Sequence, residues 1–126
     1  RSATQIELAQ TDCRNIGIQA PVRSSGDTKG TPGVTLRGPG GTLTVPEGVM
    51  IADRHIHMTP AQAAAFGLAD GDRVQVKIDG PKPGVMGGVL IRANDKCALD
   101  FHIDTDDGNA FLLKQGQLVT VLGKEE

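Results

Sequence analysis

The stretch Val49-Met50-Ile51-Ala52-Asp53-Arg54-His55-Ile56-His57-Met58-Thr59-Pro60 decides how this chain folds. Its apolar residues flank and alternate with two histidines, which is the pattern of a strand. Residues two apart in a strand share one face and lie roughly 6.6 Å apart, so both imidazoles are expected on one side. Thr59, Pro60 and Gln62 then form a capping box that predicts a helix over 61–66, ended by Gly67.

The third and last histidine of the chain lies in a second strand-like stretch, Asp100-Phe101-His102-Ile103-Asp104. Three imidazole nitrogens at about 2.0–2.1 Å from one ion, with a fourth position open, are typical of a catalytic zinc site. We therefore expect His55, His57 and His102 to hold one metal ion. The alternative is that His55 and His57 are ordinary polar residues of the surface.

The charged residues next to the histidines each have two possible roles. Asp100 and Asp104, each two residues from His102, either orient its imidazole or are solvated carboxylates of a turn. Arg54 is expected on the strand face opposite the histidines, in a salt bridge or at the surface. Alternation within a strand would place Cys97 and His102 on opposite faces, which argues against a catalytic pair.

The rest of the chain predicts a mainly β fold. It contains 17 Gly and seven Pro with only 2% aromatic residues, which suits short strands and many turns better than a helical bundle. At 126 residues it forms one ordinary domain or two very small ones. Further helices are expected over 9–16 and near 109–112, and a loop over 80–84. The expected strands are 4–8, 34–36, 42–45, 49–52, 73–78, 89–92, 98–103 and 118–122.

A weak internal repeat is visible at a spacing of 50 residues. Gln5-Ile6-Glu7-Leu8 aligns with His55-Ile56-His57-Met58, and Ile16-Gly17-Ile18 aligns with Phe66-Gly67-Leu68. A true repeat predicts two similar small β-barrel domains, with the carboxylate of Glu7 at the position that His57 occupies in the second copy. A chance match is the alternative.

Composition excludes several classes of partner. A net charge of −2 gives no general attraction to nucleic acid or to an anionic membrane. No apolar run approaches the length of a membrane span. Cys13 and Cys97 are isolated and are expected as reduced thiols of a cytosolic protein. Because the chain opens at Arg1 without an initiator Met, we expect it to be part of something longer.

Three motifs in order resemble the PduL-type phosphate acyltransferases, a family of phosphate propanoyltransferases. They are Arg54-His55-Ile56-His57-Met58-Thr59-Pro60, Phe101-His102-Ile103-Asp104-Thr105-Asp106, and Ser25-Gly26-Asp27-Thr28-Lys29-Gly30-Thr31-Pro32-Gly33. Gln5-Ile6-Glu7 adds to the resemblance, which runs from Arg1 to about Ala110.

The resemblance implies two similar β-barrel domains and two zinc ions at their junction. Residues 1–46 would be the C-terminal part of an incomplete first barrel, and residues 47–126 the second barrel. His55, His57 and His102 would bind one zinc ion and Glu7 the other, while Arg1 would hold phosphate. The reaction implied is the exchange of a propanoyl or acetyl group between coenzyme A and phosphate.

The resemblance also implies partners and a location. Ser25, Gly26 and Gly30 would let backbone amides approach the pyrophosphate or pantetheine of coenzyme A, although tight turns explain these residues equally. The family has another His-x-His motif that this chain lacks, so we expect a missing N-terminal segment that completes the ligands around Glu7. A homo-oligomer, a cytoplasmic location inside a bacterial microcompartment and a role in propanediol degradation are further expectations.

Two other functions remain open at this stage. A zinc hydrolase would use the same three histidines to hold an ion that lowers the pKa of water from about 15.7 to about 7. A non-catalytic barrel module would use the metal for folding alone. For the transferase we expect direct attack of phosphate on the thioester, without an acyl-enzyme.

Overall fold

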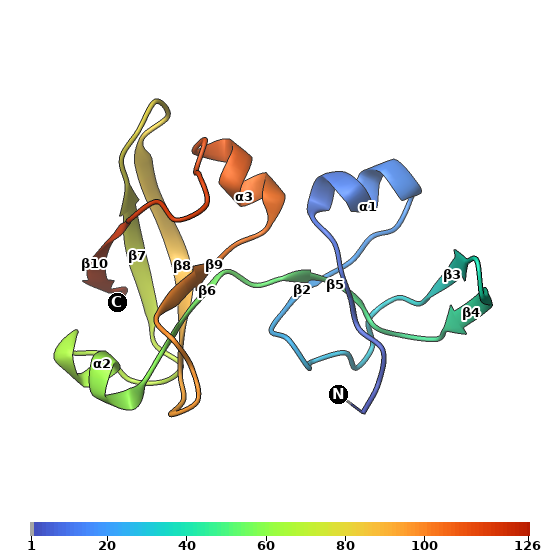
Figure 1. Ribbon diagram of the computed structural model, residues 1–126, viewed down its shortest axis with the longest axis horizontal. Helices are drawn as coiled ribbons and strands as arrows, with labels where there is room; N and C mark the ends of the chain where they lie inside the picture. The colour runs from blue at the N-terminus through green and yellow to red at the C-terminus, as the bar shows by residue number, and fades with distance from the viewer. Residues whose placement is uncertain (1) are drawn as a thin grey trace. The chain divides into compact units, whose positions relative to one another are not determined.

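The structure is a computed structural model that describes residues 2–126, and it divides the chain into two compact units (Figure 1). The first unit is Arg1–Asp53 and the second is Arg54–Glu126. Each unit has its own strands and its own buried residues. The predicted mainly β character is confirmed, since the three helices are short and strands dominate.

The first unit contains a small parallel sheet and a hairpin. Its central strand is β5, which pairs in parallel with β1 on one side and with β2 on the other. Strands β3 and β4 form the antiparallel hairpin. The elements in chain order are β1 (Ile6–Glu7), α1 (Gln10–Ile16), β2 (Val22–Arg23), β3 (Val34–Gly38), β4 (Gly41–Val45) and β5 (Val49–Ala52).

The second unit is built on one mixed sheet of five strands in the order β10-β7-β8-β6-β9. Strand β6 is parallel to β8 and antiparallel to β9, so it brings the His-x-His motif between two neighbours. The elements are β6 (His55–Met58), α2 (Pro60–Ala65), β7 (Arg73–Ile78), β8 (Gly84–Ala93), β9 (Asp100–His102), α3 (Thr105–Ala110) and β10 (Thr120–Lys124).

Alternation along these strands forms the core of the second unit. In β7 every second residue is buried, and in β6 the buried Ile56 and Met58 alternate with the half-buried His55 and His57. The inward face is therefore apolar and the outward face carries the histidines. The buried core consists of Ile56, Met58, Ala63, Leu68, Val74, Val76, Ile78, Met86, Val89 and Ile91.

The predicted helix ends are confirmed at both copies of the 50-residue spacing. Gly17 and Gly67 have φ angles of 75° and 72°, which a glycine adopts without the strain of a Cβ atom. The Ile18 amide donates to the Cys13 carbonyl at 2.9 Å, and the Leu68 amide donates to the Ala63 carbonyl at 2.8 Å. A short helix with a glycine stop is therefore present at both positions.

Several element bounds differ from the predictions. Strand β8 begins at Gly84, inside the segment predicted as a loop, and β1 covers only Ile6–Glu7 of the predicted 4–8. Helix α3 begins at Thr105, earlier than expected. The Asp104 carboxylate accepts a hydrogen bond from the Asp107 amide and thereby caps the helix. Among residues 2–126, no hydrogen-bonded pairing joins the edge strands β9 and β10, so the sheet is open and not a closed barrel.

Candidate metal centre

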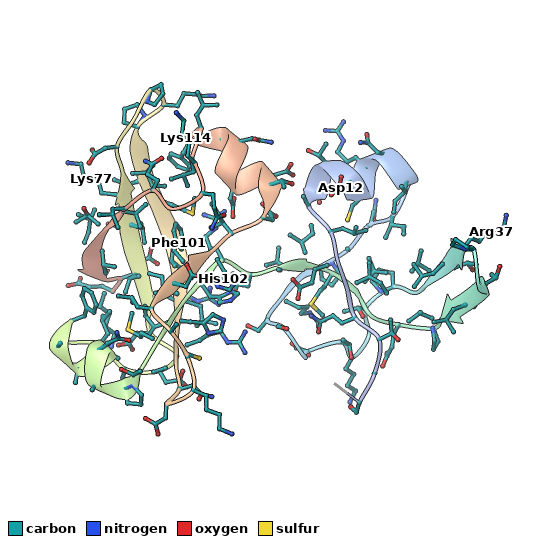
Figure 2. The ribbon with its side chains drawn as sticks, viewed as in Figure 1. Asp12, Arg37, Lys77, Phe101, His102 and Lys114 are labelled. Carbon is teal, nitrogen blue, oxygen red and sulfur yellow. The ribbon has the colours of Figure 1, made fainter. Side chains whose placement is uncertain are left out.

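Three histidines converge on one face of the second unit. Antiparallel pairing of β6 with β9 sets His55 opposite His102, and His57 lies two residues further along β6 on the same face. The ring centroids are 4.7 Å apart for His55 and His57, 5.0 Å for His55 and His102, and 4.8 Å for His57 and His102. Figure 2 shows the labelled His102 side chain on β9. Sheet register thus unites residues that lie far apart in the sequence.

The donor atoms fit a divalent metal ion that accepts nitrogen ligands. The Nε2 atoms of His55 and His57 are 3.1 Å apart, and one nitrogen from each of the three rings lies within 4.8 Å of the others. Tetrahedral bonds of about 2.0–2.1 Å place two ligand nitrogens about 3.3 Å apart, close to the spacing of the first pair.

Charges and burial around the cluster favour the neutral form of His57. Partial burial lowers the pKa of His57, and the neighbouring His55, His102 and Arg92 lower it further, while the carboxylate of Asp100 opposes them. A neutral imidazole carries the lone pair that a metal ion requires. The environment of His57 therefore supports ligation near neutral pH.

Asp100 is the acidic neighbour that contacts the cluster. Its Oδ2 atom lies 3.1 Å from Nε2 of His102, whereas Asp104 caps helix α3. With Nε2 engaged by Asp100, the Nδ1 atom of His102 is the nitrogen left for the ion. Of the two carboxylates considered from the sequence, the structure assigns the orienting contact to Asp100 alone.

Arg92 is a neighbour that sequence reasoning missed. It pairs with His57 in the parallel register of β6 and β8, is half-buried, and its positive charge acts on the His57 ring. Its signal in the sequence was an arginine at the end of an otherwise apolar strand, Val89-Leu90-Ile91-Arg92. The centre thus combines three imidazoles placed to share a metal ion with a guanidinium, a group that pairs with anions.

Cys97 also contacts the cluster, although the sequence argument gave it no role. Its Sγ atom lies 3.3 Å from Nδ1 of His57. The alternation argument fails here because Cys97 lies in the turn before β9 and is not part of that strand. The pairing of turn and strand brings together two residues that are 40 positions apart.

The other predicted site residues belong to the first unit. Glu7 is an exposed residue of β1 and accepts a hydrogen bond from the Gln5 amide group. Arg1 lies outside the described residues. Among residues 2–126, the three histidines are the one group of three or more side chains with donors placed to share a metal ion.

The predicted coenzyme A loop is braced by hydrogen bonds inside the first unit. The Gly26 amide donates to Gln5 Oε1 at 2.7 Å, and the Ser25 hydroxyl accepts from Gln5 Nε2 at 3.1 Å. The Gly30 amide donates to Glu47 Oε2 at 3.2 Å. Both glycines have positive φ angles, so a turn conformation explains them in this structure.

A cavity of about 730 Å³, lined by both apolar and polar side chains, lies in the second unit. Ile56 and Phe101 line it, and these residues alternate with the histidines along β6 and β9. None of the three histidines is among its lining residues. The cavity opens between β9, helix α3 and β10, and Asp100, which contacts His102, is among its lining residues.

Comparison with known proteins identifies the family. The model of the phosphate propanoyltransferase family matches residues 1–114. The chain belongs to the phosphate propanoyltransferase family. The resemblance seen in the sequence motifs is thereby confirmed, and the residues that carry it include the three clustered histidines.

Curated phosphate propanoyltransferases give the same answer. The chain is 45% identical over 123 residues to the enzyme of Thermotoga maritima, covering 97% of this chain and 59% of that protein. It is 43% identical over 122 residues to the enzyme of Lachnoclostridium phytofermentans, with 97% and 57% covered. It is 46% identical over 111 residues to the enzyme of Salmonella typhimurium, and this match covers 87% of this chain and 53% of that protein. The chain therefore spans a little over half the length of these relatives.

The structure gives no candidate for a membrane-spanning helix among the described residues. None of the helices within residues 2–126 has the length and the apolar character needed to cross a bilayer.

Proposed function

We propose that this chain provides the three-histidine metal centre of a phosphate acyltransferase. The reaction is acyl-CoA plus phosphate giving acyl phosphate plus free coenzyme A, with propanoyl-CoA or acetyl-CoA as the acyl donor. The supporting observation is that His55, His57 and His102 converge in a chain of the phosphate propanoyltransferase family. Zinc is the proposed metal, since imidazole nitrogen is among its preferred ligands.

The residues of the centre would divide the work of the reaction. A zinc ion bound there supplies Lewis acidity toward oxygen and sulfur. His55, His57 and His102 would hold the ion, and Asp100 would orient the ring of His102. Arg92 adds a positive charge beside His57, where it would neutralise phosphate and hold it for attack.

The bond changes balance without a side-chain nucleophile. A phosphate oxygen forms a bond to the thioester carbonyl carbon, and the carbon–sulfur bond breaks. The thiolate of coenzyme A leaves with the bonding electron pair and takes up a proton released from phosphate. We therefore propose direct transfer with no acyl-enzyme.

Several finer features of the family stay proposals for this chain. Glu7 would bind a second zinc ion only with donors from a segment beyond the described residues, such as the N-terminal part expected from the family. Arg1 would hold phosphate, and Ser25, Gly26 and Gly30 would lie along coenzyme A. A domain boundary near residue 46, a homo-oligomer, and a location in a bacterial microcompartment with a role in propanediol degradation belong with these proposals.

A thiol-release assay tests the function. Propanoyl-CoA is incubated with the chain and zinc, with and without phosphate, and free coenzyme A and propanoyl phosphate are measured. The transferase predicts thiol release that saturates with phosphate and an equal yield of propanoyl phosphate. Thiol release without phosphate would instead indicate the hydrolase. Zinc binding without any turnover would indicate either the non-catalytic module or a centre that needs the expected N-terminal segment.

A further inference from the structure

The two nitrogens of the His57 ring have different partners. Nε2 faces the cluster and lies 3.1 Å from Nε2 of His55, while Nδ1 lies 3.3 Å from the sulfur of Cys97. The lone pairs of an imidazole's two nitrogens point away from each other. In this arrangement the sulfur of Cys97 lies at the ring nitrogen that points away from an ion held by Nε2, so it is not placed as a ligand of that ion.

The turn that carries Cys97 is itself fixed. The Cys97 amide donates to the Asn94 carbonyl at 3.1 Å, and the Lys96 amide donates to Asn94 Oδ1 at 2.8 Å. The Cys97 side chain is half-buried, although its neighbours Lys96 and Ala98 are exposed. The sulfur is thus directed toward His57 by a hydrogen-bonded turn.

The contact bears on which nitrogen of His57 carries the proton. A neutral imidazole has one protonated nitrogen, and only the other can give its lone pair to a metal ion. Ligation through Nε2 requires the proton on Nδ1, and the Cys97 sulfur is the acceptor placed to receive that N–H. In metal sites of proteins, a partner on the second nitrogen commonly fixes both tautomer and ring orientation.

We infer that Cys97 is a positioning residue of the metal centre, which holds His57 in the Nδ1–H tautomer with Nε2 directed at the ion. The inference rests on the proposed function, because it takes the three histidines as the metal ligands. It goes beyond that function because it assigns the Cys97 thiol the task of orienting His57. Asp100 performs the same task for His102.

The experiment compares the full chain with Cys97→Ala, Cys97→Ser and the control Asp95→Asn, which changes an exposed residue of the same turn. Long-range proton–nitrogen NMR on metal-free protein reports the tautomer of His57, and titration with zinc alone reports affinity. We expect wild type to show the Nδ1–H tautomer. Cys97→Ala should mix the two tautomers and weaken zinc binding about 10- to 100-fold, the usual effect of losing such a partner.

The serine variant and the control separate positioning from folding. Serine keeps a polar acceptor on a shorter bond, so it should restore part of the zinc affinity, and Asp95→Asn should bind zinc as wild type does. Circular dichroism checks that all variants are folded.

Two results would overturn the inference. Unchanged tautomer and zinc affinity in Cys97→Ala would do so while leaving the transferase proposal intact. A thiolate-to-metal charge-transfer band in the cobalt-loaded wild type that is lost in Cys97→Ala would make Cys97 a ligand. Failure of wild type to bind zinc at all would instead remove the metal centre, and with it the proposed function.

Discussion

The Oδ1 atom of Asp107 lies 2.8 Å from Nη2 of Arg54, so helix α3 is bound by an ion pair to the residue that precedes β6. Arg54 also donates from Nη1 to the Gly87 carbonyl in β8 at 3.2 Å. One guanidinium thus holds the start of the His-x-His strand to two other elements of the second unit. The prediction that Arg54 forms a salt bridge is confirmed.

Replacing Arg54 should change the titration of Asp107. Burial raises the pKa of the Asp107 carboxyl, and Arg54 partly offsets this effect by favouring the ionised form. Arg54→Met should therefore raise the pKa of Asp107 further and cost about 1–3 kcal/mol of stability at neutral pH. Carbon-detected NMR titration of the carboxyl measures the pKa. Arg37→Met, at an exposed arginine of β3, is the matched control, and an unchanged Asp107 pKa in Arg54→Met would contradict the argument.

Removing a histidine should abolish stabilisation by zinc. A ligand that binds only the folded state adds about 2.7 kcal/mol of stability when its concentration is a hundred times its Kd. Wild type should gain stability of this size with excess zinc, and His57→Ala should gain little. Thermal unfolding with and without zinc, followed by circular dichroism, measures the difference. Gln75→Ala, an exposed change on β7, should respond to zinc as wild type does. Equal zinc responses of His57→Ala and wild type would refute the proposed ligand set.

Thr31 should be essential to the stability of the first unit. It is the buried polar residue whose hydroxyl donates to the Thr28 carbonyl at 2.6 Å and accepts the Gly48 amide at 2.8 Å. Thr31→Val keeps the shape but leaves the Gly48 N–H without this acceptor, at a cost of about 1–3 kcal/mol. Urea unfolding followed by circular dichroism suits a chain without Trp or Tyr. Thr31→Ser, which retains the hydroxyl, should lose clearly less stability than Thr31→Val.

Asp72 should make the second unit sensitive to acid. The Ala69 amide, at 2.9 Å, and the Lys124 ammonium, at 3.2 Å, lower the pKa of this carboxyl below its ordinary value of 3.8. A carboxyl whose pKa is lowered in the folded state stabilises the protein at pH values above its ordinary pKa. This stabilisation is lost as the pH falls through the folded-state pKa. Urea midpoints measured from neutral to acid pH should fall less steeply in Asp72→Asn than in wild type. Parallel curves would show that Asp72 contributes nothing to acid sensitivity.

The sequence predicted what local pattern controls. Alternation placed His55 and His57 on one face, and the capping box of Thr59 and Gln62 forms as expected, with hydrogen bonds of 3.2 Å and 2.9 Å between the two residues. Gly67 ends the following helix as its conformational freedom allows. These features depend on residues within a few positions of one another.

Features that depend on strand register were not accessible from the sequence. The contacts of Arg92 and Cys97 with His57 follow from how β8 and the turn before β9 lie beside β6. The early start of α3 was missed because Asp104 was considered as a partner of His102 and not as a helix cap. The open edge between β9 and β10 likewise follows from pairing that no local pattern specifies.

The position of β9 has a consequence for local unfolding. This strand is three residues long and lies at the edge of the sheet, where it pairs with β6, yet it carries His102. An ion shared by β6 and β9 would act as a clamp on the segment of the sheet that opens most easily. Chelation should then speed amide exchange in β9 ahead of β7 and β8, and expose the peptide bond after Lys96 to trypsin. Resistance to trypsin would therefore report whether the centre holds an ion, and this measurement needs no substrate.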